Sequence, residues 1–142
     1  MNRRSFIRQS CAGCGAIAAM GWSAALLQAC KTPAGILKAQ SEQGWITIFR
    51  NRLDPNLPTH IVRDDNLEYD ILLIRENEGW RALYMQCTHE NSPVYLSGTQ
   101  IFCNSHGSRF NLTGEVLQGP ASVNLRRFEV KEEHDALKIK TA

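Results

Sequence analysis

Two cysteines and two histidines alternate along the middle of the sequence, first as C-x-H and then as C-x-x-H. They are Cys87 and His89, followed by Cys103 and His106. Thiolates and imidazoles are good ligands for zinc and for iron–sulfur clusters, and four of them could hold either. Thirteen residues separate His89 from Cys103, which is enough for one β-hairpin. Two loops at strand ends could therefore bring the four side chains together.

Other chemistries compete for these residues. A structural zinc site uses the same ligands, but its common spacing places both cysteines before both histidines. A Cys103–His106 nucleophile pair would leave Cys87 and His89 without a role. A Cys87–Cys103 disulfide is compatible with an oxidising compartment, but it would leave both histidines unexplained.

Short β-strands separated by frequent turns surround these residues. No helical periodicity follows the N-terminal segment, so the sequence predicts an all-β antiparallel sandwich or barrel. The two Cys/His pairs each follow a predicted strand, at 80–86 and at 99–102. The other predicted strands are 45–50, 59–64, 69–76, 93–96, 124–132 and 136–141.

The sequence around the four residues resembles the Rieske family of [2Fe-2S] proteins. The matching text is CTH at 87–89, CNSHGSRFN at 103–111, Gly114 and GPA at 119–121, within a resemblance that covers roughly 45–142. The resemblance implies a Rieske-type sandwich or barrel with a cluster-binding subdomain at about 86–121. It also implies one [2Fe-2S] cluster per chain.

By position, the resemblance assigns the inner iron to Cys87 and Cys103 and the outer iron to His89 and His106. Residues that shape and tune the cluster follow from the same match. Gly107 allows a tight turn, and Ser108 matches a serine whose hydroxyl bonds a bridging sulfide in high-potential members. The loop that covers the cluster is matched by Gly119, Pro120 and Ala121.

Three positions depart from the quinol-oxidising members of the family. Those members carry two further cysteines in a loop disulfide, where this chain has Ser92 and Ser105. They also carry a tyrosine whose hydroxyl bonds a ligand cysteine, where this chain has Phe110. Because hydrogen bonds to sulfur stabilise the reduced cluster, we expect a reduction potential below that of quinol oxidases.

The first 30 residues read as an export signal. Paired Arg3 and Arg4 are followed by Phe6 and Ile7 at the offsets of the twin-arginine motif, and an uncharged stretch follows. The stretch ends in LQAC, which resembles a lipobox and predicts lipidation at Cys30. An uncleaved membrane anchor is the alternative, because about 20 apolar residues span a bilayer.

The signal at 1–30 precedes a predicted polar linker at 31–43 and a domain at 44–142. The chain has 16 basic and 14 acidic residues; without the signal's three arginines, 13 and 14 remain, a net charge of −1. A near-neutral domain argues against nucleic acid as a partner. Outside the ligand quartet we expect His60 and His134 at the surface, and Trp45 and Trp80 in the core.

Together these features predict an exported, membrane-tethered one-electron carrier on the outer face of a bacterial membrane. It would serve a redox partner protein or complex, like the small subunit of arsenite oxidase, rather than act as a stand-alone catalyst. One alternative is the iron–sulfur subunit of a quinol–cytochrome complex. Another, of a different class, is a non-redox zinc module.

Overall fold

The computed structural model describes residues 34–142, so the signal segment, the lipobox and Cys30 lie outside the described residues. Within 34–142 no helix is long and apolar enough to cross a membrane. The described chain is nearly all β, which confirms the predicted fold class. Its elements are β1 (Gly35–Ala39), β2 (Ser41–Glu42), β3 (Trp45–Phe49), η1 (Arg50–Arg52), β4 (Thr59–Asp64), β5 (Ile71–Glu76), β6 (Gly79–Tyr84), β7 (Val94–Ser97), β8 (Gln100–Cys103), β9 (Arg109–Asn111), β10 (Val116–Gln118), β11 (Arg127–Glu132) and β12 (Ala136–Lys140).

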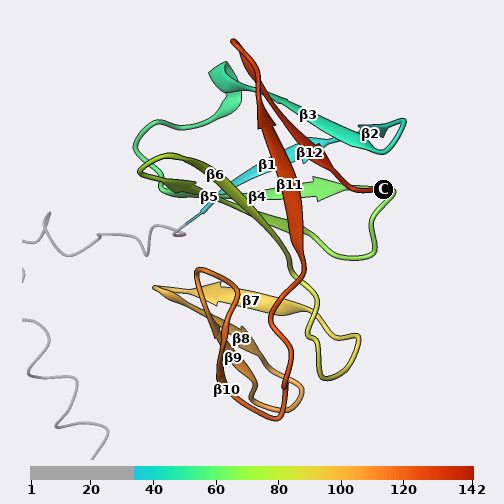
Figure 1. The fold of residues 1–142 in the computed structure, drawn as a ribbon, viewed down its shortest axis with the longest axis vertical. Coiled ribbons are helices and arrows are strands. Elements are labelled where there is room, and N and C mark those ends of the chain that lie inside the picture. The colour runs from blue at the N-terminus through green and yellow to red at the C-terminus, as the bar shows by residue number, and fades with distance from the viewer. Residues whose placement is uncertain (1–33) are drawn as a thin grey trace, which may run out of the picture. The chain divides into compact units, whose positions relative to one another are not determined.

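Eight strands form a nearly closed sheet in the order β1-β4-β5-β6-β11-β12-β3-β2 (Figure 1). All neighbouring pairs are antiparallel except β1 and β4, which run parallel from Gly35 opposite His60 to Ala39 opposite Asp64. The predicted antiparallel arrangement therefore holds with this one exception.

The linker predicted over 31–43 is wrong for residues 35–39 and 41–42, which form β1 and β2. Leu37 is buried in the core of the large sheet, and β1 forms its ladder with β4, about 25 residues later. Local sequence does not reveal such a strand, because its partner is distant and its two large apolar residues, Ile36 and Leu37, are adjacent and do not alternate with polar ones. The folded domain thus begins before the predicted boundary at Gly44.

A second sheet of four short strands, in the order β10-β9-β8-β7, forms a separate layer (Figure 1). β9 and β10 have three residues each and were not predicted, because strands this short carry almost no alternation. A hydrophobic cluster joins the two sheets, with Leu83 from β6 and Ile101 from β8 among its buried members. Cys87 and Cys103 belong to the same cluster, so this core holds both thiols in place.

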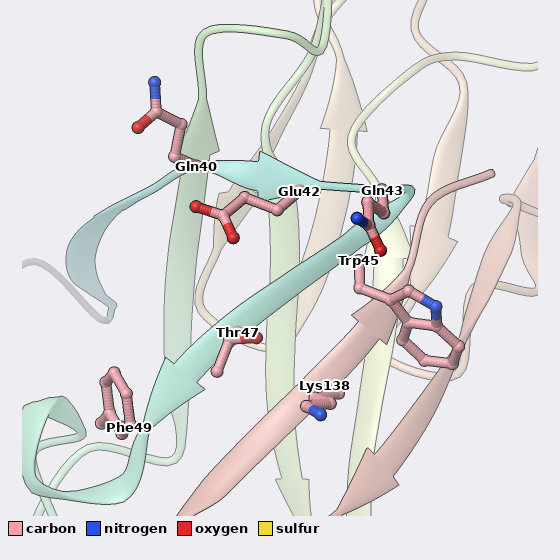
Figure 2. Close-up of a pocket in the computed structure, with 7 residues that line it drawn as sticks. All are labelled: Gln40, Glu42, Gln43, Trp45, Thr47, Phe49 and Lys138. Carbon is pink, nitrogen blue, oxygen red and sulfur yellow. The ribbon is translucent and has the colours of Figure 1, made fainter.

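Trp45 is not a core residue, contrary to expectation. Its side chain lies on the outer face of β3, in a hollow of about 540 Å³ whose floor also includes Thr47 and Lys138 (Figure 2). The ammonium of Lys131 lies 4.8 Å from the centre of the indole ring. Ile46 and Ile48 occupy the inward positions of β3. Because side chains alternate along a strand, Trp45 lies on the opposite, outward face.

The prediction that His60 lies at the surface is also wrong, since only 1% of the residue is exposed. The backbone N–H of Asp54 donates to its Nε2 at 3.1 Å. Burial and the positive charge of Arg75 lower the pKa of His60, while Asp54 acts in the opposite direction. His60 is therefore a neutral core residue at neutral pH, not a solvated one.

Candidate metal centre

The loop that follows β6 carries Cys87 and His89. Cys87 is 2% exposed, and its backbone N–H donates to the Ser92 carbonyl at 2.7 Å. An isolated bridge between Gln86 and Pro93 closes the base of this loop. His89 lies farther along the loop and is exposed. The first loop thus has a buried thiol at its base and a solvent-facing imidazole near its tip.

The second loop begins at Cys103, the last residue of β8, and repeats this pattern. Cys103 is 2% exposed, and its N–H donates to the Ser108 carbonyl at 2.9 Å. Its carbonyl accepts from the Gly107 N–H at 3.0 Å. Gly107 has a φ of 79°, a left-handed conformation that side chains rarely adopt. This turn leaves His106 exposed.

The structure brings all four predicted ligand residues together. Cys87 and Cys103 are both free thiols, and the Cys103 side chain hydrogen-bonds that of Cys87. The rings of His89 and His106 lie edge to face, with centroids 5.0 Å apart. Figure 1 shows the loops after β6, β8 and β10 at one end of the small sheet. That these residues bind a metal stays a prediction.

The thiol of Cys87 is set up to ionise. Burial by itself raises its pKa, because a thiolate is poorly solvated in the core. Hydrogen bonds from the backbone of His89 and Glu90 act against this effect, as do those from the side chains of Cys103 and Ser108. Together they outweigh burial, so the pKa of Cys87 is lowered. A deprotonated thiol is the form that binds metals.

Ser108 connects the second loop to the predicted covering loop. It is fully buried, and its Oγ accepts a hydrogen bond of 3.0 Å from the backbone N–H of Ala121. Because that bond occupies an oxygen lone pair, the hydroxyl proton remains available for Cys87. Gly119 and Pro120 precede this contact and are exposed, so the covering loop is anchored at Ala121.

The three departures from the quinol-oxidising pattern have distinct surroundings. Phe110 is fully buried in the cluster that holds both cysteines, so its ring supplies packing and no hydroxyl. Ser92 is half-buried and Ser105 is exposed. Among residues 34–142 no hydrogen bond joins these two side chains. The second loop is instead tied to the covering loop, through Ser108 and Ala121.

Two further residues were not singled out by sequence reasoning. The Thr88 hydroxyl donates to the Val123 carbonyl, which fixes the first loop to the chain after the covering loop. A carboxylate oxygen of Glu90 lies 3.6 Å from Nδ1 of His106. The only sequence signal was their position on either side of His89, which does not say what they contact.

The donor set fits a two-iron cluster with mixed ligands. Two thiols are buried side by side and two imidazoles face solvent, so sulfur and nitrogen donors occupy opposite ends of the site. A [2Fe-2S] cluster in which two histidines replace two cysteines on one iron needs this division. A single tetrahedral zinc would not require the donors to be segregated by type.

Comparison with known proteins also indicates a [2Fe-2S] protein. The family model described as Rieske [2Fe-2S] domain matches residues 49–129. The chain is 25% identical over 142 residues to a protein of Chlorobaculum thiosulfatiphilum named cytochrome b6-f complex iron-sulfur subunit. That match covers 99% of this chain and 76% of the relative.

Solved structures share the fold. The match to a chain in the complex of oxygenase and ferredoxin of carbazole 1,9a-dioxygenase has a TM-score of 0.51 at 24% identity. It covers 70% of this chain and 95% of that one. The match to a quaternary ammonium Rieske monooxygenase has a TM-score of 0.55 at 18% identity, covering 70% and 33%. At these identities the likeness is one of fold.

Proposed function

The chain belongs to the Rieske [2Fe-2S] family, and from this membership we propose which residues hold its cluster and which partner it serves. Its cofactor is a Rieske-type [2Fe-2S] cluster, and it is an electron carrier of that type. We assign the inner iron to Cys87 and Cys103 and the outer iron to His89 and His106. The buried thiols and exposed imidazoles are the observation that carries this assignment.

The bound cluster supplies one-electron chemistry, and mixed ligation makes it less negative than an all-cysteine cluster. The chain's own residues decide access. Cys87 and Cys103 lie in the core between the sheets, where water is excluded. His89 and His106 lie at the surface, so an electron enters or leaves at the imidazole end.

The finer proposal is an exported, membrane-tethered carrier that serves a periplasmic oxidoreductase, in the manner of the arsenite oxidase small subunit. Three residues support it against a quinol oxidase, namely Ser92, Ser105 and Phe110, which lack the loop disulfide and the tyrosine hydroxyl. The twin-arginine motif supports export of a folded protein, which a cluster assembled in the cytoplasm needs. Lipid at Cys30, or an uncleaved anchor, would tether it.

A second candidate is the iron–sulfur subunit of a quinol–cytochrome complex. The match to the Chlorobaculum b6-f subunit favours it, because it runs along 99% of this chain. The zinc alternative has no comparable support, since the chain belongs to an iron–sulfur family.

The deciding experiment is a potentiometric titration of the full chain followed by electron paramagnetic resonance (EPR). A reduced-state Rieske signal is expected, whereas a zinc protein would be silent. A midpoint below that of quinol-oxidising subunits supports the finer proposal, and a midpoint equal to theirs supports the second candidate. Export is tested by replacing Arg3 and Arg4 with lysine and measuring the periplasmic fraction, and lipidation by Cys30→Ala.

A further inference from the structure

The exposed tip of the site carries one carboxylate that no ligand role explains. Glu90 follows His89 directly, and its side chain is 58% exposed. One of its oxygens lies 3.6 Å from Nδ1 of His106. The potential ligand atoms of His89, Glu90 and His106 all lie within 4.8 Å of one another. A formal negative charge therefore lies at the point where an electron would leave.

Neighbouring charged groups on the small sheet have other contacts. The guanidinium of Arg109 lies over the Phe102 ring, 5.2 Å from its centre. The carboxylate of Glu115 accepts a hydrogen bond of 2.8 Å from the Asn111 side chain. Among residues 34–142 the carboxylate of Glu90 has no hydrogen bond, and no basic group other than the imidazole of His106 lies within 4.0 Å of it. The carboxylate is therefore largely accessible to solvent.

The chain segment bonded to the first loop carries an exposed apolar residue. Val123 is 62% exposed, and its carbonyl accepts the hydroxyl bond from Thr88 in the first loop. The electron-transfer face thus combines two imidazoles, an apolar neighbour and one carboxylate. Burying an unpaired carboxylate at an interface is unfavourable, so a partner with a wholly apolar entry site would bind less well.

We infer that Glu90 determines partner specificity by selecting a redox protein with a lysine or arginine at its electron-entry site. This inference rests on the proposed function, because it takes the imidazole end as the electron portal. A charge at an interface rim acts chiefly on the rate of encounter and on its salt dependence. The carboxylate would therefore act before electron transfer, by favouring productive collisions with cationic partners.

Two outer-sphere oxidants of opposite charge test the inference without the natural partner. Hexacyanoferrate(III) is an anion and tris(phenanthroline)cobalt(III) is a cation, and each takes one electron from the reduced protein with no proton transfer. Glu90→Gln should raise the ratio of anionic to cationic oxidation rates about fivefold at low ionic strength. The difference should vanish at high salt, where the carboxylate is screened.

The control is Glu78→Gln. Glu78 is exposed in the turn before β6, at the opposite end of that strand from the Cys87 loop. This variant should leave the ratio unchanged.

Glu90→Gln should also raise the midpoint potential of the protein, because the reduced site carries one more negative charge than the oxidised site. A higher midpoint slows both oxidants, so it largely cancels in the ratio and is measured separately by titration.

An unchanged rate ratio in Glu90→Gln, or an equal rise in Glu78→Gln, would overturn the inference while leaving the proposed function intact. A wild-type chain without a reduced EPR signal would instead refute the proposed function, and the inference with it.

Discussion

The backbone N–H of Ala121 donates a 3.0 Å hydrogen bond to the Ser108 hydroxyl oxygen, at a point where both residues are buried. This bond joins the second ligand loop to the covering loop in a chain that has no cysteine at 92 or 105 for a loop disulfide. It also orients the hydroxyl, because the oxygen accepts from Ala121 and its proton can then donate to Cys87. One serine thus contributes to both the geometry and the electronics of the site.

Ser108→Ala should therefore lower the midpoint potential. Loss of one hydrogen bond to the reduced site costs about 1 kcal/mol, which is on the order of 40 mV for one electron. Potentiometric titration measures the change. Ser105→Ala removes an exposed hydroxyl from the same loop and should leave the midpoint where it is. Equal midpoints for Ser108→Ala and wild type would show that the hydroxyl does not reach the cluster sulfur.

Phe110→Tyr should shift the potential in the opposite direction. Phe110 is fully buried in the cluster that holds both cysteines, so an added hydroxyl needs an acceptor, and a ligand sulfur is the one we expect. The gain should be on the order of 40 mV for one hydrogen bond. Phe102→Tyr, at a half-buried ring on β8, is the matched control. The assignment fails if both variants raise the midpoint equally.

His106→Ala should abolish the iron–sulfur centre, because a site with one imidazole lost cannot complete the outer iron's coordination. Iron content per chain and the reduced EPR signal give the readout. His134→Ala removes an exposed imidazole between β11 and β12 and should retain both. A full iron complement in His106→Ala would contradict the assignment of this ligand.

Because His60 is buried, we expect the free energy of unfolding to fall in mild acid. Burial and Arg75 lower its pKa from the ordinary value of 6.5, so below that pH the unfolded chain binds a proton that the folded chain resists. The free energy of unfolding therefore has its full value above pH 6.5. It falls as the pH drops from 6.5 toward the lower pKa of His60 in the folded chain, by at most about 1.4 kcal/mol per pH unit.

Urea unfolding at pH 7.5 and at pH 5.5 measures this difference. His60→Gln can still accept the bond from the Asp54 N–H but does not titrate, so it should show a smaller loss of stability between the two pH values. His134→Ala serves again as the control and should retain the wild-type loss. Identical losses in wild type and His60→Gln would assign the acid sensitivity to other groups.

Gly114→Ala should destabilise the domain more than Gly98→Ala does. Both glycines have positive φ, 87° and 58°, so both variants incur about 1 kcal/mol of backbone strain. A Cβ at Gly114 would also lie 3.0 Å from the Leu83 side chain, whereas one at Gly98 would meet nothing within 4 Å. The overlap should add about 1 kcal/mol or more to the unfolding free-energy loss. Equal losses would mean that Leu83 moves aside freely.

Local sequence patterns were sufficient to predict many of the strands, the proposed ligands and the family of this protein. Strands such as β4 and β12 carry enough alternating residues to be found from sequence, and β4 was predicted with its observed bounds. The four proposed ligands could also be picked out from the sequence, because each Cys/His pair lies within a single short loop. Family membership followed from the same short motifs. These features depend on neighbours along the chain, which sequence shows directly.

Tertiary structure decided what depends on register and on contacts between loops. β1 exists because it pairs with β4, and Trp45 faces outward while His60 faces inward. Alternation divides a strand into two faces but does not say which face meets the core. The bond from Ala121 to Ser108 and the approach of Glu90 to His106 each join residues more than ten positions apart. Only the folded sheets bring those loops together, because the packing between the sheets, and not the local sequence, sets the distance between their ends.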